Sequence, residues 1–502
     1  MKNEKNILKI YTLSYFMIKF YYFVQLLNDI FLIFYYNIEL LGRKNMKKIM
    51  IFLIIGILVL GGIGVGAFSI KKTNTLSISS DKYDMVIIAP KIFSGALQPL
   101  INHKNSHDVK TFLKTTEEIY SKYTGRDSAE QIKYFIKDAI ETYGIQYVLL
   151  VGGHKGQSFL WYIPVRIVHL DDGARYTEYV SDLYYADIYR EDGSYEDWNS
   201  NGDDVIGEWG KDTFDLKPDI AVGRVPCRTT KEVDMIVNKI IEYETMSFDE
   251  SWFHQLLIAG GDSIPNSGAP FPYEGEAVCN EAIAIMKDFS VRKLFVSDLS
   301  LMDSSDFIAA WNQGSGFSLY SGRAGPSSFL TYDSNGNPVT PFDVKEIGQL
   351  QNKGKYPVFI IQGCLSGKFD VTILNVMKWL LKQPNIQTSD IAFDCIGWDM
   401  VKLQNGGAIA AIAPTSQCWV ESGDKDKNGI PDIAESLSGF LALEFLRVYA
   451  DEGIHTLGTM YMKAIQNYVS VFPVHSNKID CKTIQEFGLI GDPSLKIGGY
   501  YL

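Results

Sequence analysis

Short apolar runs alternate with amphipathic stretches along the chain beyond residue 80. The run Tyr147–Val151 is typical of a strand buried on both faces. The preceding stretch, Ser128–Tyr143, has apolar residues at helical spacing. Ser128 and Gln131 fit a capping box, and Gly144 fits a helix stop. The two elements therefore predict a helix that leads into a buried strand.

The same alternation continues to the end of the chain. Further strands are expected at Lys82–Pro90, Asp219–Val222, Leu256–Ala259, Val291–Val296, Phe317–Tyr320, Val358–Ile361 and Ala408–Ala413. Further helices are expected at Thr229–Glu244, Glu274–Lys287, Asp303–Trp311, Val371–Leu381, Cys395–Leu403, Ser436–Tyr449 and Thr456–Tyr468. Alternating strands and helices predict an α/β fold, with a parallel sheet flanked by helices and right-handed crossovers. We place a boundary near residues 245–255, which gives an N-terminal subdomain, 80–250, and a second subdomain, 251–502.

The segment Met50–Phe68 is a run of nineteen uncharged residues, which is long enough to cross a bilayer as a helix. Four basic residues lie between positions 43 and 48, just before this run. The positive-inside rule then predicts a transmembrane anchor, 46–72, at the cell membrane with the bulk of the chain outside the cytoplasm. A cleaved signal peptide is the alternative. Residues 1–45 are also hydrophobic and are interpreted as a leader, an interfacial helix or an extra membrane segment.

Charge is distributed unevenly along the chain. Residues 1–72 carry ten basic and three acidic residues, so the remainder has a formal net charge of −19, against −12 for the whole chain. So acidic a domain is not expected to bind nucleic acid through a general electrostatic field. The six cysteines are too few for a disulfide framework and lack the spacing of zinc ligands, and no HExxH motif is present, which argues against a zinc enzyme.

Two acidic loops have the twelve-residue spacing of a calcium loop, with oxygen ligands at alternate positions, a glycine at the turn and a distant carboxylate. The first supplies Asp197, Asn199, Asn201, Asp203 and Glu208. The second supplies Asp424, Asp426, Asn428, Asp432 and Glu435. Solvated turns are the alternative, because Asx-Gly runs also arise from turn chemistry. We expect calcium with a structural role at both loops.

Candidate chemistry lies in two segments that follow predicted strands. Cys364 comes directly after Gly363 at the end of the run PVFIIQGC, and α/β enzymes place reactive groups at such strand ends. Taken alone, Cys364 would more often be a buried structural thiol than a reactive group. The second segment, Phe317–Phe329, ends its strand in Ser-Gly and continues with Arg323 and Ala324.

Together these segments resemble the gingipain-type cysteine peptidases, relatives of the caspases. Five more stretches resemble family segments in the same order, and the resemblance covers roughly residues 82–500. They are Asp182–Tyr189, Asp219–Val233, Leu256–Ser263, Asn405–Ser416 and Gly488–Ile497. The resemblance implies a caspase/gingipain-like sheet, a protein or peptide substrate and Cys364 as the nucleophile. It also implies an oxyanion hole formed by the N–H groups of Cys364 and Ala324.

The family's catalytic histidine falls on Arg323. A guanidinium beside Cys364 favours the thiolate, but it stays protonated and cannot act as the general acid or base. Loss of such catalysis costs typically about 10²- to 10⁴-fold. Two function hypotheses remain: a membrane-anchored cysteine-type endopeptidase, which the resemblance implies, or a peptidase-like module that binds peptides or a surface partner without cleaving them.

Overall fold

The computed structural model describes residues 82–173, 176–203, 205–246, 250–264, 273–383 and 388–500. The chain from Ser79 onward forms one compact unit. The predicted leader, 1–45, and the predicted anchor, 46–72, lie outside the described residues. Within the described part, no helix combines the length and the apolar character needed to cross a bilayer.

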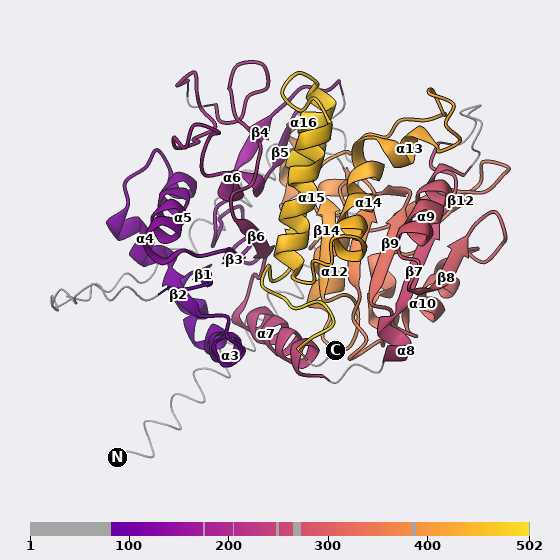
Figure 1. The fold of residues 1–502 in the computed structure, drawn as a ribbon, viewed down its shortest axis with the longest axis horizontal. Helices are drawn as coiled ribbons and strands as arrows, with labels where there is room; N and C mark the ends of the chain where they lie inside the picture. Colours follow the sequence, from indigo (N-terminus) through magenta and orange to yellow (C-terminus); the bar gives the residue numbers. More distant parts are fainter. Residues whose placement is uncertain are drawn as a thin grey trace, which may run out of the picture. The chain divides into compact units, whose positions relative to one another are not determined.

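A ten-stranded sheet forms the centre of this unit (Figure 1). In spatial order its strands are β2 (Thr111–Thr115), β1 (Met85–Ala89), β3 (Tyr147–Val151), β6 (Ala221–Val225), β15 (Phe487–Ile490), β14 (Ala410–Pro414), β13 (Val358–Gln362), β9 (Phe317–Ser321), β7 (Gln255–Gly260) and β8 (Ser290–Phe295). Neighbouring strands are parallel, except that β15 runs antiparallel to β14. The expected α/β fold with a mostly parallel sheet is confirmed.

The two halves of the sheet follow the order of the chain. Strands from before residue 250 form the half that ends at β6, and later strands form the half that begins at β14. Strand β15, close to the C-terminus, pairs with both β6 and β14 and joins the halves. The independence of the ranges 80–250 and 251–502 as subdomains stays a prediction.

Helices cover the sheet. The longer ones are α3 (Ser94–Ser106), α5 (Ser128–Tyr143), α7 (Thr230–Thr245), α9 (Glu274–Ile285), α10 (Ser304–Trp311), α14 (Leu437–Ala450), α15 (Leu457–Val471) and α16 (Lys478–Glu486). Shorter ones include α6 (Leu183–Ala186), α11 (Asn375–Leu380), α12 (Ile396–Lys402) and α13 (Asp432–Glu435). In Figure 1 the yellow helices α14 and α15 cross in front of the sheet, where α14 contacts β13 and α15 contacts β6.

Helix α5 illustrates how local sequence sets the bounds of an element. Gly144 adopts the left-handed conformation, with φ of +73°, and its N–H donates to Ile140, so the predicted stop is confirmed. The predicted capping box at Ser128 is wrong. The cap is Asp127, whose carboxylate accepts the N–H of Glu130, because an aspartate one residue earlier fills the same role.

Strands β9 and β13 bring the candidate chemistry to one edge of the sheet. All residues of both strands are buried, as their apolar runs predict. They pair in parallel, with Ser321 opposite Gln362. Parallel strands in this register end side by side, so the segments that follow them meet at the same edge.

Candidate active site

The loop after β9 is fixed to the end of β13. The N–H of Gly322 donates to the carbonyl oxygen of Gln362 at 3.1 Å. The chain then enters a small antiparallel sheet through β10 (Arg323–Ala324) and β11 (Phe329–Tyr332). From β9, the buried hydroxyl of Tyr320 lies 2.8 Å from the carbonyl oxygens of Arg323 and Leu330 and can donate to either. The position of the Arg323 backbone is therefore set by a core residue.

The two predicted segments meet directly. A Cβ added at Gly363 would lie 2.8 Å from the Cβ of Ala324 and 3.3 Å from the carbonyl oxygen of Gly322. Only glycine at position 363 allows this approach without a shift of either loop. The structure thus brings Gly363, Cys364, Arg323 and Ala324 together at one edge of the sheet, here called the rim.

The sulfur of Cys364 lies against a second cysteine. Its Sγ is 3.6 Å from the Sγ of Cys418 and 3.6 Å from the carbonyl oxygen of Cys418. The hydrogen bond with the Cys418 thiol lowers the pKa of Cys364 to about 7, against the effect of burial. The same contact raises the pKa of Cys418, so Cys418 is the thiol that keeps its proton. Cys364 therefore has substantial thiolate character near neutral pH.

Two cations contribute to this electrostatic environment. Arg323 is exposed and belongs to no ion pair within the described residues, and its charge lowers the pKa of Cys364. Lys482 of α16 acts in the same direction from inside the protein. It is fully buried and pairs with Asp172 at 2.5 Å. Both cations favour the thiolate, and neither guanidinium nor ammonium readily releases a proton at neutral pH.

The backbone at Cys364 is suited to an oxyanion hole. Within the described residues, the N–H of Cys364 has no hydrogen-bond acceptor. The next residue, Leu365, has a φ of +61°, an uncommon conformation for a residue with a side chain. Its N–H donates to Ser416 at 2.8 Å, which holds the turn in place. The N–H of Cys364 is therefore available to a ligand, as an oxyanion hole requires.

All seven histidines lie in the described residues, and none contacts the Cys364 sulfur. The one considered as a substitute, His154, donates its Nε2–H to the carbonyl oxygen of Asp370 at 3.2 Å and stacks on Trp161. Five others contact different residues: His103 with Glu244, His107 with Tyr500, His169 with Glu178, His254 with Phe289 and His455 with Tyr449. His475 is exposed.

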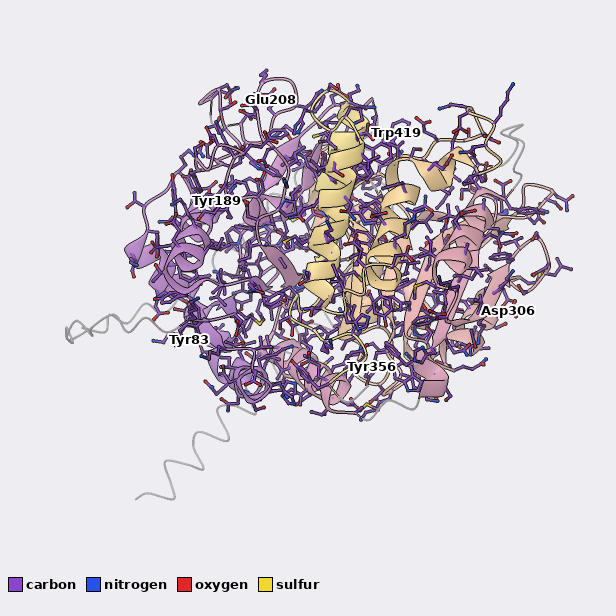
Figure 2. The ribbon with its side chains drawn as sticks, viewed as in Figure 1. Tyr83, Tyr189, Glu208, Asp306, Tyr356 and Trp419 are labelled. Atoms are coloured by element: carbon purple, nitrogen blue, oxygen red, sulfur yellow. The ribbon has the colours of Figure 1, made fainter. Side chains whose placement is uncertain are left out.

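Cys418 and the buried groups of α16 were missed from the sequence. Cys418 follows β14, the strand beside β13, so it reaches the same edge as Cys364. Trp419, labelled in Figure 2, donates its indole N–H to Asp172, the partner of Lys482. Glu486 is 1% exposed, and both carboxylate oxygens lack a hydrogen-bond partner within the described residues. Burial raises its pKa to about 8, and Cys364 adds to the shift.

The first acidic loop brings only some of its predicted ligands together. Asp197 lies 3.3 Å from Arg126 and 3.6 Å from Arg190, so its charge is already paired. Asn201 donates its side-chain N–H to Asp203 at 3.0 Å. Two buried oxygens, Oδ1 of Asn199 and Oε2 of Glu208, have no partner within the described residues. Each of these oxygens is available to a cation or an ordered water.

The second acidic loop gathers three carboxylates. Oxygens of Asp426, Asp432 and Glu435 all lie within 4.8 Å of one another. Asn428 bridges Asp426 and Glu435 through its side-chain N–H group, at 3.0 and 2.8 Å. Asp424 instead accepts backbone N–H groups of the loop, including that of Gly429. Three convergent carboxylates are a donor set that suits a hard cation such as Ca²⁺.

A family model confirms what the rim and the fold suggest. The model described as peptidase family C25 matches residues 78–498, so the chain belongs to that family, the gingipain-type cysteine peptidases. Among curated proteins, Gingipain R2 of Porphyromonas gingivalis (strain ATCC BAA-308 / W83) is 23% identical over 292 residues. That match covers 57% of this chain and 32% of the relative. Gingipain R1 of Porphyromonas gingivalis gives the same identity over 24% of its length. This chain thus spans about a third or less of these relatives.

Solved structures agree on the fold. The crystal structure of the Arg-specific cysteine proteinase gingipain R has a TM-score of 0.58 at 18% identity, covering 85% of this chain and 80% of that one. The complex of Porphyromonas gingivalis RgpB pro- and mature domains has a TM-score of 0.57 at 19% identity, covering 82% and 79%. At this identity the likeness establishes the fold alone.

Proposed function

We propose that this chain binds extended protein or peptide segments at the rim beside Cys364 and does not cleave them efficiently. The observation that carries the proposal is that the charge of Arg323 acts on the Cys364 sulfur, whereas none of the seven histidines is a hydrogen-bond partner of that sulfur. Family membership supports protein or peptide ligands. The thiolate and the unused N–H of Cys364 can attack and polarise a carbonyl group, but the leaving amine finds no imidazole to protonate it.

The test compares the wild type with Cys364→Ala and Arg323→His on labelled casein in the presence of calcium. We expect casein binding by the wild type and by Cys364→Ala, with cleavage at background. Arg323→His should raise cleavage, by up to about 10²- to 10⁴-fold, because it restores a proton carrier. Efficient cleavage by the wild type that Cys364→Ala abolishes would contradict the proposal.

A second candidate, a cysteine endopeptidase, is favoured by one specific contact. The Cys418 thiol lies against Cys364 and keeps its proton, so it is placed to protonate the leaving amine in place of an imidazole. Cys418→Ser distinguishes the two candidates. If Cys418 is the proton donor, the wild type should cleave casein and Cys418→Ser should not, even at a pH where Cys364 of the variant is ionised; casein binding should be unchanged in either case.

The two acidic loops support a further proposal, that calcium stabilises the domain. The second loop has three convergent carboxylates, and the first has the unpartnered oxygens of Asn199 and Glu208. A bound Ca²⁺ would supply charge neutralisation and would hold loop residues together. Its role is structural, and the cysteine chemistry does not depend on it.

We also propose that residues 46–72 anchor the chain at the cell membrane, with the main domain outside the cytoplasm. The support is the uncharged run Met50–Phe68 and the basic cluster that precedes it. The test is membrane fractionation together with protease treatment of intact cells. Two results would contradict the proposal. One is release of the domain from membranes by a high-pH wash, and the other is protection of the domain from protease added to intact cells.

A further inference from the structure

Two reduced cysteines lie next to each other at the rim. The Sγ atoms of Cys364 and Cys418 are 3.6 Å apart, and both residues are partly exposed. The remaining four cysteines are each fully buried: Cys227, Cys279, Cys395 and Cys481. Burial also raises the pKa of each of these four thiols. Among the six cysteines, all of which the structure describes, only the rim pair combines a neighbouring thiol with partial exposure.

The backbone around the pair is held at defined points. The N–H of Leu365 donates to Ser416, and the N–H of Gly367 donates to Pro414, each at 2.8 Å. These bonds tie the turn of Cys364 to the end of β14 and to the segment that follows it. Cys418 itself lies in irregular backbone beyond them. A disulfide needs the two sulfurs at about 2.05 Å, a closure of roughly 1.6 Å. Rotation of two side chains and a small movement of irregular backbone can supply that closure.

The two thiols of the pair differ in pKa. The first thiol, Cys364, is ionised to a large extent near neutral pH, since its pKa lies at about 7. The second, Cys418, stays protonated because the Cys364 thiolate lies beside it. A thiolate with a neighbouring thiol is the arrangement in which oxidation of the first sulfur is followed by attack of the second.

We propose that Cys364 and Cys418 form a site of oxidative modification, at which hydroperoxides convert the two thiols into a disulfide. First, the Cys364 thiolate attacks one oxygen of the hydroperoxide. The O–O bond breaks, a sulfenic acid forms on Cys364, and the other oxygen leaves as an alcohol or as water after taking up a proton. The sulfur has then lost two electrons to the peroxide.

Second, the Cys418 sulfur attacks the sulfenic sulfur. The S–S bond forms and the S–O bond breaks, and hydroxide leaves as water with the proton of Cys418. Conversion of Cys364 to the sulfenic acid also removes the negative charge that kept Cys418 protonated. Overall, two thiols and one hydroperoxide give a disulfide, an alcohol or water, and one further water. A dithiol reductant reverses the modification by thiol–disulfide exchange.

This inference goes beyond the proposed function and is independent of whether the chain cleaves peptides. In either case the disulfide would remove the reactive sulfur from the rim. It would also protect Cys364 from oxidation to sulfinic and sulfonic acids, which thiols do not reverse. In the presence of peroxide, the disulfide would therefore inactivate Cys364 reversibly, whatever chemistry this residue performs.

The experiment treats the full chain with hydrogen peroxide, alkylates the remaining thiols, and maps the peptides by mass spectrometry. We expect a crosslinked peptide pair containing Cys364 and Cys418, with the loss of two hydrogen atoms and of two alkylatable thiols, and full recovery after dithiothreitol. Cys418→Ser, oxidised at a higher pH because loss of the Cys418 thiol raises the pKa of Cys364, should give a Cys364 sulfenic acid that dimedone traps. The matched control is Cys395→Ser, which removes a buried thiol and should leave the crosslink unchanged.

Three outcomes would overturn the proposal. One is Cys364 oxidised to sulfinic or sulfonic acid with Cys418 still alkylated. Another is both thiols still alkylated after peroxide, and the third is Cys364 crosslinked to another cysteine. Thermal unfolding of Cys418→Ser, measured in parallel, shows whether that variant is folded. Because the readout is mass, the result does not depend on the casein experiment.

Discussion

Gly363 packs against Ala324 so closely that a Cβ on the glycine would lie 2.8 Å from the alanine Cβ. The two residues belong to the loops that follow β13 and β9, and each adjoins a residue of the candidate chemistry, Cys364 or Arg323. The positions of the sulfur and the guanidinium are therefore coupled through the contact between Gly363 and the methyl group of Ala324. A change at either small residue should alter stability and thiol chemistry together.

The first prediction is that Gly363→Ala is destabilising. The added methyl group must displace the Ala324 loop, and overpacking of this kind costs typically about 1–3 kcal/mol. The measurement is the free energy of unfolding in urea. Gly325→Ala is the matched control, because a Cβ there meets nothing within 4 Å. Equal stability of the two variants would contradict the packing argument.

The second prediction concerns the charge of Arg323. Its guanidinium lowers the pKa of Cys364, so Arg323→Gln should raise it. The rise should be small, because Arg323 is exposed and solvent screens its field. The measurement is the pH dependence of iodoacetamide alkylation at Cys364, followed by mass spectrometry.

Cys418→Ser should raise the pKa of Cys364 more than Arg323→Gln does. The hydrogen bond with the Cys418 thiol is the main cause of the low pKa of Cys364, and a serine hydroxyl replaces that bond only in part. Lys231→Gln removes an exposed cation of α7 and is the control for a general charge effect. If Arg323→Gln leaves the alkylation profile at its wild-type position, the guanidinium does not act on the sulfur.

Much of the sheet could be predicted because its strands are short apolar runs. The bounds of β9 and β13 differ from the predicted ones by a single residue at one end. Their neighbouring positions followed from the family resemblance and from parallel pairing. The structure then placed Arg323 and Cys364 at one rim, as expected. The sequence pattern was enough to predict these strands because a strand buried on both faces appears as an uninterrupted run of apolar residues.

Other elements could not be predicted because tertiary contacts override their local patterns. Helix α16 buries Asp480, Lys482, Gln485 and Glu486, and polar residues in a sequence favour an exposed segment. Helix α3 contains Pro99, which argues against a helix interior. Cys418 was missed because only the spatial order of the strands puts β14 beside β13.

The third prediction is that Glu486 makes stability depend on pH. Its folded pKa is about 8, against 4.5 in the unfolded chain, so the folded state binds more protons between these values. The free energy of unfolding should therefore fall as pH rises from about 5 to 8, by up to roughly 1.4 kcal/mol per unit. Three ionisable neighbours act on this carboxyl group: Lys482, Cys364 and Asp172.

Glu486→Gln replaces the carboxyl group by a neutral group of the same shape, so it should flatten this pH dependence. Urea unfolding at a series of pH values measures the effect. Glu191→Gln changes an exposed carboxyl group and is the control. A slope that persists in Glu486→Gln would assign the pH dependence to other groups.

The fourth prediction tests calcium. Removal of calcium with a chelator should lower the melting temperature, because a ligand that binds only the folded state adds about 2.7 kcal/mol at a concentration 100 times its dissociation constant. Asp432→Asn should reduce the response, since it removes a charge from the three convergent carboxylates. Glu208→Gln tests the first loop in the same way, and Figure 2 labels its position.

Asp333→Asn is the matched control for both loops. Asp333 lies in a similar Asx-Gly turn, where its carboxylate accepts N–H groups of Asn335 and Asn337, and an asparagine oxygen can accept them equally. This variant should therefore keep the full response to calcium. A melting temperature that neither chelator nor added calcium changes would show that both loops are solvated turns, held by their own hydrogen bonds.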